Sequence, residues 1–321
     1  MSNGSSRSPV RLATTTSAFD TGLLTKLKSV WECTQSEYDL IIESLGSGQA
    51  LDLAVNHGAD VTLTHSPVRE GELLACHILK CRKHIFYNQF VFVGGGDNPK
   101  VIGDDWLLKK CFKAIANNPS FTFVSRNDDS GTNVREDEIW ELLYPLIGKP
   151  SNVENMDPSP NGRGMMATLV YTNWLAANCE PAFTLSDDGT FFRYEFLKEE
   201  NEPLGPSIVC DLGPSDNKLS VRSHVAPPDP PDPWALNQYA LSLVNPCVAQ
   251  GDFTGAKAFF GWMFGDEAKN IIMEYGENEI NRPYFNYNAE QDEPDSPFLR
   301  LLYHMRQQRN RKYYERMYLN R

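Results

Sequence analysis

Three short stretches of the sequence place hydroxyl and glycine residues where a predicted strand passes into a predicted helix: residues 14–17, 46–48 and 130–132. The first turn of a helix has backbone N–H groups without intrahelical partners, and it carries the positive end of the helix dipole. Each stretch therefore supplies several hydrogen-bond donors, and Arg126 adds a full positive charge shortly before the third. A set of donors with few acceptors favours non-covalent binding of an anion that has several oxygens.

Each stretch by itself also has a structural explanation, because Ser, Thr and Gly are common at helix N-caps. Ser130 or Thr132, for example, occupies the N-cap position of a helix that we expect over 133–143. In an open α/β sheet, however, such turns gather at the carboxyl ends of the strands, where ligands bind. About six to eight hydrogen bonds to a charged group, each contributing roughly 1.5–3 kcal/mol, would be enough for nanomolar affinity.

The segments around these stretches alternate between strand and helix patterns. The first strands are expected over 9–16, 38–45 and 59–64, and the helices between them begin at Ser17, as an N-cap, and at Gln49. This βαβαβ order with short loops is typical of a parallel sheet covered by helices. Farther along the chain, strands are expected over 85–93, 121–124 and 239–244, and helices over 70–79, 106–116, 133–143, 164–178 and 253–275.

Several of these stretches belong to a series of motifs that runs from residue 11 to about residue 276. The series includes Leu12-Ala13-Thr14-Thr15-Thr16-Ser17, Gly46-Ser47-Gly48-Gln49-Ala50-Leu51, Ser125-Arg126, Gly164-Met165-Met166-Ala167-Thr168-Leu169 and Thr184-Leu185-Ser186-Asp187-Asp188-Gly189-Thr190. In this series the chain resembles the tungstate-binding proteins of bacterial ABC importers, within the type II periplasmic binding-protein superfamily. The resemblance implies an α/β, two-lobed type II periplasmic binding-protein-like fold. Each lobe is then a mainly parallel sheet flanked by helices, and two crossings join the lobes.

The same resemblance implies how the chain divides. Lobe 1 is expected over 9–93 plus 238–292, and lobe 2 is expected over 94–237 as an insertion between its two parts. We expect the first crossing near 94–99 and the return crossing in the strand over 239–244. A proline-rich insert over 227–233 and a basic tail over 293–321 lie outside the family pattern. We interpret the tail as a helix that packs on the acidic body, with docking to a membrane or an acidic surface as the alternative.

Carried over position by position, the resemblance assigns anion binding to seven residues: Thr15, Thr16 and Ser47 from lobe 1, and Arg126, Ser130, Gly131 and Thr132 from lobe 2. The expected function is non-catalytic binding of tungstate or molybdate in the interlobe cleft. The protein would be a solute-binding protein, or a homologue adopted as an anion sensor or carrier. No cofactor or metal is expected. The expected partners are the small inorganic oxyanion and an ABC permease, and the protein is expected to be a monomer.

Two alternatives stay open. Monohydrogen phosphate carries a proton and needs an acceptor, which Asp128 or Asp129 could supply, although both aspartates also suit the start of a helix. A protein that binds a phosphorylated metabolite, or an enzyme that acts on one, could use the same cleft with His65 as the base. We interpret His65 as structural, because one histidine without an identified partner is weak evidence for catalysis. Arg163 departs from the family pattern, and we interpret it as a surface charge.

Length and composition set further limits. A chain of 321 residues with 41% hydrophobic content is expected to form about two globular domains, and its net charge of −12 argues against nucleic acid as a partner. Seven scattered cysteines favour reduced thiols, and residues 1–9 lack the apolar segment of a secretion signal. These features indicate the cytoplasm by default, whereas the resembled family is periplasmic or extracellular. The spacing of Cys76, His77, Cys81 and His84 is too irregular to predict a zinc site.

Overall fold

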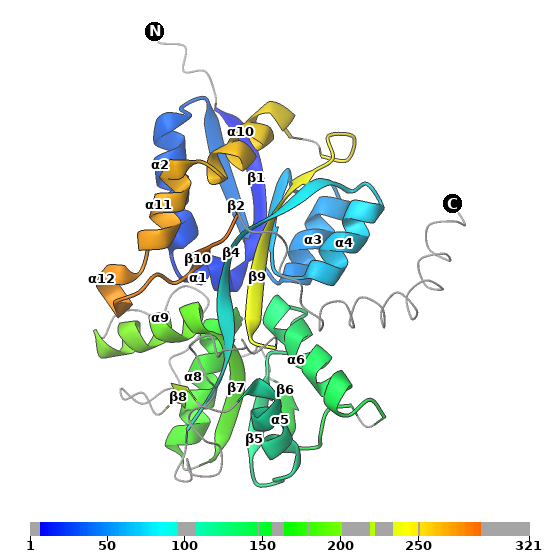
Figure 1. Ribbon diagram of the computed structural model, residues 1–321, viewed down its shortest axis with the longest axis vertical. Helices are drawn as coiled ribbons and strands as arrows, with labels where there is room; N and C mark the ends of the chain where they lie inside the picture. Colours follow the sequence, from blue (N-terminus) through cyan, green and yellow to red (C-terminus); the bar gives the residue numbers. More distant parts are fainter. Residues whose placement is uncertain are drawn as a thin grey trace. The chain divides into compact units, whose positions relative to one another are not determined.

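The computed structural model describes residues 7–95, 107–146, 148–155, 164–178, 180–200, 219–221, 234–249 and 251–289. The described strands form a mixed sheet in the order β2-β1-β3-β9-β4-β7-β5-β6, and β8 and β10 pair with β4 (Figure 1). Arg163, the proline-rich insert and the basic tail lie outside the described residues.

Three parallel strands make the centre of the part that we call lobe 1. β1 (Ser8–Thr15) lies between β2 (Tyr38–Leu45) and β3 (Val61–Thr64) and pairs in parallel with both. β9 (Leu236–Val244) continues the sheet antiparallel to β3. The remaining elements of lobe 1 are α1 (Thr16–Asp20), α2 (Leu23–Thr34), α3 (Ser47–Val55), α4 (Pro67–Ala75), α10 (Phe253–Met263), α11 (Asp266–Glu274), α12 (Glu277–Ile280) and β10 (Asn286–Tyr287).

Lobe 2 is built around a second parallel set. β5 (Thr122–Ser125) pairs in parallel with β6 (Val153–Asn155) and β7 (Ala182–Asp187). The other described elements of this lobe are α5 (Leu108–Ala116), α6 (Gly131–Leu143), α8 (Gly164–Ala177), α9 (Asp188–Glu199) and β8 (Ser220–Val221). As in lobe 1, the carboxyl ends of parallel strands lead into helices, so the turns that follow the strands are placed for ligand binding.

One long strand, β4 (Leu79–Gly94), belongs to both lobes. Residues 79–89 pair with β9, and residues 90–94 pair with β7, in both cases antiparallel. The chain therefore passes from lobe 1 to lobe 2 inside β4, upstream of the crossing expected near 94–99. The strand can continue across this point because β9 and then β7 supply partners for its backbone N–H and C=O groups.

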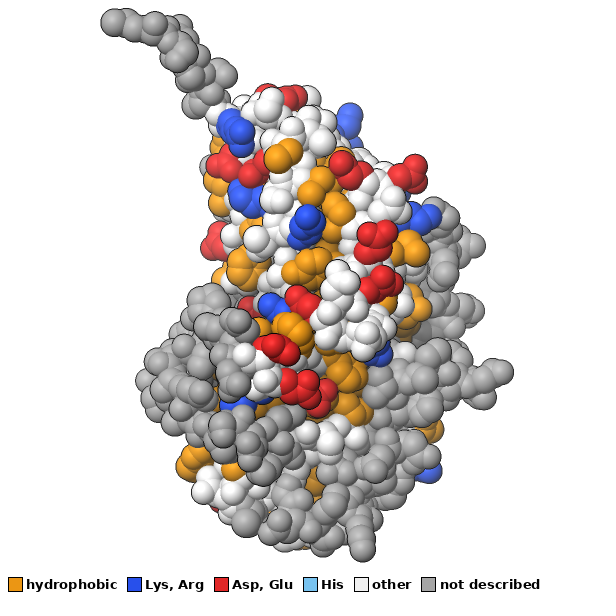
Figure 2. All heavy atoms as spheres, turned by 90° about the vertical axis from the view of Figure 1, so that its left-hand side faces the viewer, with side chains coloured by type: hydrophobic (Ala, Val, Ile, Leu, Met, Phe, Trp, Pro, Cys, Tyr) orange, Lys and Arg blue, Asp and Glu red, His pale blue; other side chains and the backbone are white. Residues whose placement is uncertain are grey.

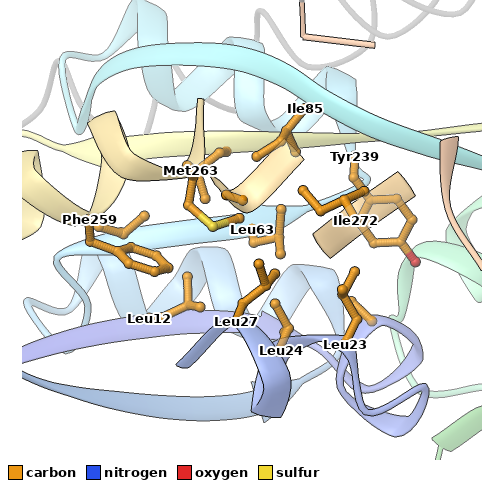
Figure 3. Packing of buried hydrophobic residues seen from close by; sticks show 14 of the residues in the cluster. Leu12, Leu23, Leu24, Leu27, Leu63, Ile85, Tyr239, Phe259, Met263 and Ile272 are labelled. Carbon is orange, nitrogen blue, oxygen red and sulfur yellow. The ribbon is translucent and has the colours of Figure 1, made fainter. Parts of the chain in front are cut away.

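The core of lobe 1 lies between the sheet and the helices α2 and α10 (Figure 3). The helical spacing of leucines in α2 puts them on one face of the helix, where they can all be buried. Burying a leucine or phenylalanine side chain contributes roughly 1.5–3 kcal/mol. The cluster includes Leu12, Leu63 and Ile85 from the strands, Leu23, Leu24 and Leu27 from α2, and Phe259 and Met263 from α10, each at most 1% exposed.

An aromatic cluster fixes the position of α6 against the end of β5 in lobe 2. Phe123 of β5 and Trp140 of α6 are in edge-to-face contact with ring centroids 5.7 Å apart. Phe112 of α5 contacts both rings, at 5.3 and 4.7 Å. All three side chains are buried. The turn that joins β5 to α6 is thus held between two rigid elements.

The predicted α/β class and the βαβαβ order are confirmed, and three details differ from the expectation. Thr15, not Ser17, is the N-cap of α1, since its hydroxyl accepts a hydrogen bond from the Ala18 N–H. The long helix expected after it is broken at Gly22, which has the left-handed φ of 84°. The sheet is mixed and not mainly parallel, because β4 and β9 run antiparallel to the strands beside them.

The side of the molecule that lies on the left in Figure 1 carries α2 and α11. Acidic, basic and hydrophobic side chains are interspersed on it (Figure 2). Among the described helices, none is long and apolar enough to cross a membrane. Within the described part of the chain the thiols of Cys33, Cys76, Cys81 and Cys247 are free.

Candidate functional site

The three hydroxyl-rich stretches all lie where a strand ends and a helix begins. β1 ends at Thr15 and α1 begins at Thr16, β2 ends at Leu45 and α3 begins at Ser47, and β5 ends at Ser125 ahead of α6. Ser130 is the N-cap of α6, and its hydroxyl accepts a hydrogen bond of 3.2 Å from the Asn133 N–H. Of the two N-cap candidates for this helix, Ser130 is therefore the correct one.

The turn of lobe 1 that contains Ser47 contacts the turn of lobe 2 that contains Ser130. The Gly48 N–H donates a hydrogen bond to the Asp129 carbonyl oxygen, with the two atoms 3.4 Å apart. A Cβ on Gly46 would lie only 3.2 Å from the Asp128 carbonyl oxygen and from the Ser130 Cα. Glycine at positions 46 and 48 thus allows the two backbones to approach closely.

Arg126 connects the same lobe 2 turn to the threonines of lobe 1. Its side chain is 2% exposed, and its Nη2 donates a hydrogen bond of 3.3 Å to Thr16 Oγ1. Its Nε and Nη2 also donate to Asp128 Oδ2, over 3.1 and 2.7 Å. The other carboxylate oxygen of Asp128 accepts from the Ser130 N–H at 3.1 Å. Asp128 thus orients the guanidinium at the start of α6.

The electrostatic state of Asp128 follows from these contacts. Burial pushes the pKa of Asp128 upward, but the charge of Arg126 and the hydrogen bonds from Ser130 and Arg126 outweigh burial, so its net pKa is lowered. Asp128 is therefore ionised near neutral pH. Both oxygens of Asp128 accept hydrogen bonds, and its role in this structure is to hold Arg126 in place.

The turn between β5 and α6 has an unusual backbone that is held by one side chain. Asn127 and Asp129 have left-handed φ values of 49° and 54°, a conformation that Asn and Asp tolerate better than most residues. The Asn133 side-chain oxygen accepts hydrogen bonds from the Asp128 and Asp129 N–H groups, each 3.1 Å long. The donors of this turn are thus pre-organised by α6.

Three of the predicted site residues carry a buried donor atom that has no hydrogen-bond partner among the described residues: Arg126 Nη1, Ser47 Oγ and Thr132 Oγ1. A buried polar atom in this condition costs about 1–3 kcal/mol. The three atoms come from both lobes and from the turns that contact each other. Their chemistry fits an acceptor with several oxygens.

His65 packs against the start of α6. Its Nδ1 is hydrogen-bonded to Asn237 Oδ1, and its ring stacks on Tyr239 with centroids 4.6 Å apart. A Cβ on Gly131 would lie 2.1 Å from His65 Nε2, so only glycine fits at position 131. Burial lowers the pKa of His65 to about 4, against the raising effect of Asn237 and with smaller lowering effects of Arg126 and Arg135. His65 is therefore neutral near pH 7 and has the structural contacts that we expected.

A buried hydrogen-bond chain that the sequence interpretation missed runs from His65 through the two crossing strands. Asn237 Nδ2 donates to Asn88 Oδ1 at 2.7 Å, and Asn88 Nδ2 donates to Asp187 Oδ1 at 2.9 Å. Asp187 in turn caps α9, accepting from the Thr190 N–H at 2.9 Å and from its hydroxyl at 2.7 Å. The sequence signal for this chain was an asparagine in each crossing strand, Asn88 in β4 and Asn237 in β9.

The structure thus brings Thr16, Arg126 and Ser130–Thr132 together with the turn around Ser47. Thr15 lies next to Thr16, where its hydroxyl oxygen already accepts the capping bond. Asp20, at the end of α1, was also missed, and its Oδ2 is buried without a partner in the described structure. The described residues contain no grouping of His, Cys, Asp and Glu that could hold a metal ion.

Comparison with known proteins gives relatives for most of the chain. A family model described as a PBP superfamily domain matches residues 3–267. A tungstate-binding protein of Peptoclostridium acidaminophilum is 30% identical over 281 residues, which are 87% of this chain and 85% of that protein. The solved tungstate-binding protein of Desulfovibrio alaskensis G20 has a TM-score of 0.61 at 24% identity, covering 88% of this chain and 99% of its own. The solved structure of a tungstate ABC transporter from Geobacter sulfurreducens gives the same TM-score and identity, covering 82% and 97%.

Proposed function

Because the chain belongs to the PBP superfamily, we propose that it is a non-catalytic solute-binding protein whose ligand is a tetrahedral oxyanion, tungstate or molybdate. The ligand would contact the turns after β1, β2 and β5. Thr15, Thr16 and Ser47 would bind it from lobe 1, and Arg126, Ser130, Gly131 and Thr132 from lobe 2. The protein would act as a monomer, without a cofactor, and deliver the anion to an ABC permease.

The observation that carries this proposal is the set of buried donors without partners. Ser47 Oγ comes from the turn after β2, Arg126 Nη1 and Thr132 Oγ1 come from the turn after β5, and these two turns are in direct backbone contact. A single apolar ligand would leave all three donors unsatisfied. One oxyanion could accept from all of them, and each hydrogen bond to a charged group contributes roughly 1.5–3 kcal/mol.

The turn between β5 and α6 supports tungstate or molybdate over phosphate. Both of these dianions are fully deprotonated at neutral pH and only accept hydrogen bonds. Monohydrogen phosphate needs an acceptor for its proton, and the carboxylate in this turn, Asp128, already accepts hydrogen bonds from Arg126 and from the Ser130 N–H. The relative from Peptoclostridium acidaminophilum, which is 30% identical to this chain, is a tungstate-binding protein, and this supports the same ligand.

The contacts of His65 support a binding protein over an enzyme. A general base needs a nitrogen within reach of the proton that it removes. Nδ1 of His65 is bonded to Asn237, and Nε2 faces Gly131 so closely that no Cβ fits between them. The relative from Peptoclostridium acidaminophilum is likewise a binding protein.

Isothermal titration calorimetry with tungstate, molybdate, sulfate and phosphate tests the proposal. At pH 7 or below, we expect tungstate or molybdate to bind more tightly than phosphate. Preferential binding of phosphate would favour the phosphate-binding alternative, and failure of all four anions to bind with a Kd below millimolar would overturn the proposal.

A further inference from the structure

Asp20 lies on the side of α1 that faces Arg126. Residues four positions apart in a helix share a face, with Cβ atoms about 5–6 Å apart, and Asp20 follows Thr16 at this spacing. Thr16 Oγ1 accepts the hydrogen bond from Arg126 Nη2, so this face of α1 is directed toward the guanidinium. The charge of Arg126 acts electrostatically on Asp20. Asp20 therefore belongs to the same cluster as the predicted anion donors.

The Asp20 carboxyl and the Arg126 guanidinium each have one polar atom without a hydrogen-bond partner among the described residues. These atoms are Asp20 Oδ2 and Arg126 Nη1, and both are buried. The two groups do not pair with each other, because Arg126 uses its Nε and Nη2 on Asp128. A ligand oxygen that accepts from Arg126 Nη1 and from a protonated Asp20 carboxyl would satisfy both atoms.

We propose that Asp20 is a contact residue of the anion site, protonated when a fully deprotonated dianion is bound, and that it sets which anions the site accepts. This inference rests on the proposed function. The protonated Asp20 carboxyl can donate its O–H to an oxygen of the dianion. An ionised Asp20 carboxylate would instead repel the dianion. Monohydrogen phosphate brings its own proton, so it would bind to the ionised carboxyl and donate to it.

The surroundings of Asp20 place its titration in the physiological range. Burial raises the pKa of Asp20 to about 7, Arg126 opposes the rise, and Asp187 at the end of β7 adds to it. The other helices that contact α1 carry few unpaired charges in their described parts. α8 has no charged residue, Asp188 of α9 pairs with Arg282, and Lys28 of α2 pairs with Glu32 and Asp39.

Proton uptake follows from this arrangement. A dianion bound beside Asp20 makes the carboxyl hold its proton more strongly, so binding above about pH 7 takes up a proton from solution. The affinity for tungstate then falls by up to about tenfold for each unit of pH above 7. Binding of phosphate above pH 7 takes up almost no proton, because the ligand supplies it.

Calorimetry in two buffers with different ionisation enthalpies measures this uptake directly. We expect wild-type protein at pH 8 to take up nearly one proton with tungstate and to lose affinity between pH 7 and pH 9. In Asp20→Asn, whose amide mimics the protonated acid, we expect no uptake and a flat pH profile. Glu136→Gln is the matched control, because burial raises the pKa of Glu136 to about 7, against the lowering effects of Lys149 and Ser125.

The outcomes separate the two proposals. Tungstate binding by wild-type protein without proton uptake would overturn the role of Asp20 and leave the proposed function standing, and this measurement needs no variant. Uptake that persists in Asp20→Asn and disappears in Glu136→Gln would also overturn it, since the proton would then reside on Glu136. Absence of anion binding at every pH would overturn the proposed function itself and, with it, the role of Asp20.

Discussion

The Nη2 of Arg126 donates a hydrogen bond to Thr16 Oγ1 over 3.3 Å, joining two turns that are 110 residues apart in the chain and lie in different lobes. The same guanidinium keeps its Nη1 free of any partner among the described residues. Replacing Arg126 with alanine removes that donor and a full positive charge. We expect at least a tenfold loss of tungstate affinity by calorimetry, since a hydrogen bond to a charged group contributes roughly 1.5–3 kcal/mol.

The stability of the ligand-free Arg126→Ala variant should change little. The side chain of Asp128 is 31% exposed, so water can solvate its carboxylate when Arg126 is absent. Arg126→Lys is the control, because it keeps the charge but loses the fork of donors. We expect it to bind with intermediate affinity. Wild-type affinity in Arg126→Ala would exclude Arg126 from the site.

The buried hydroxyls of Ser47 and Thr132 lead to a prediction in which affinity and stability respond differently. Neither hydroxyl has a partner in the described structure, so Ser47→Ala and Thr132→Val remove an unsatisfied polar atom. The ligand-free variants should be as stable as wild type or more stable by up to about 1 kcal/mol. Their tungstate affinity should nevertheless fall about tenfold each.

Thr62→Val is the matched control for these two variants. Thr62 Oγ1 is also buried without a partner among the described residues, but Thr62 lies inside β3, paired with Ala13 of β1. The same chemical change there should leave anion affinity unchanged. An equal loss of affinity in all three variants, or none in Ser47→Ala and Thr132→Val, would contradict the assignment. Thermal unfolding with and without tungstate measures both effects.

The parts of the site that could be predicted from the sequence depend on local signals. Hydroxyl caps, short apolar strands and the 3.6-residue periodicity are properties of a few neighbouring residues, and they locate the turns at Thr15, Ser47 and Ser130 correctly. The assignment of Ser17 as a cap was wrong by two residues, because Ser and Thr are nearly equivalent as caps and four of them occur in succession. The ligand-binding role of these residues stays a prediction.

Contacts between distant segments could not be predicted in the same way. The approach of Gly48 to Asp129 and the packing of His65 against Gly131 depend on how the strands pair across the two lobes. The importance of Asp20 depends on burial, which a single acidic residue after a helical turn does not reveal. Similarly, Asn88 and Asn237 lie next to each other only because β4 and β9 pair in one specific register.

The buried His65 predicts a loss of stability in mild acid. The unfolded chain protonates this histidine near pH 6.5, whereas burial holds its pKa at about 4 in the folded protein. Between these values the unfolded state binds more protons, so stability falls as the pH decreases from 6.5 to 4 and the loss levels off below 4. The loss from this one group is on the order of 3 kcal/mol.

Comparison with His65→Gln isolates this contribution. Asp20, Glu136 and Asp188 have raised pKa values, so their contribution to the stability of the protein decreases as the pH rises. This contribution is the same in wild type and in His65→Gln, and it cancels in the comparison. Urea unfolding at several pH values should therefore show a difference in unfolding free energy that is largest above pH 6.5 and shrinks toward pH 4. A difference that does not depend on pH would show that His65 titrates normally in the folded protein.

Adding a methyl group at Gly131 is expected to destabilise the protein and to weaken anion binding. A Cβ at this position would lie 2.1 Å from His65 Nε2 and 2.4 Å from two ring carbons. The ring has little freedom to move, because it stacks on Tyr239 on one side and lies 6.0 Å from the ring of Phe90. The new methyl group must therefore displace the start of α6, which carries Ser130 and Thr132.

We expect Gly131→Ala to destabilise the protein by about 1–3 kcal/mol, the usual cost of overpacking a rigid core, and to weaken tungstate binding at least tenfold. The control is Gly261→Ala in α10, where a Cβ would meet no atom within 4 Å. There the substitution should stabilise the helix by roughly 0.5–1 kcal/mol and leave affinity unchanged. Combining Gly131→Ala with His65→Ala makes room for the methyl group, so the double variant should recover part of the lost affinity. Equal behaviour of Gly131→Ala and Gly261→Ala in thermal unfolding and calorimetry would show that α6 is not held against His65.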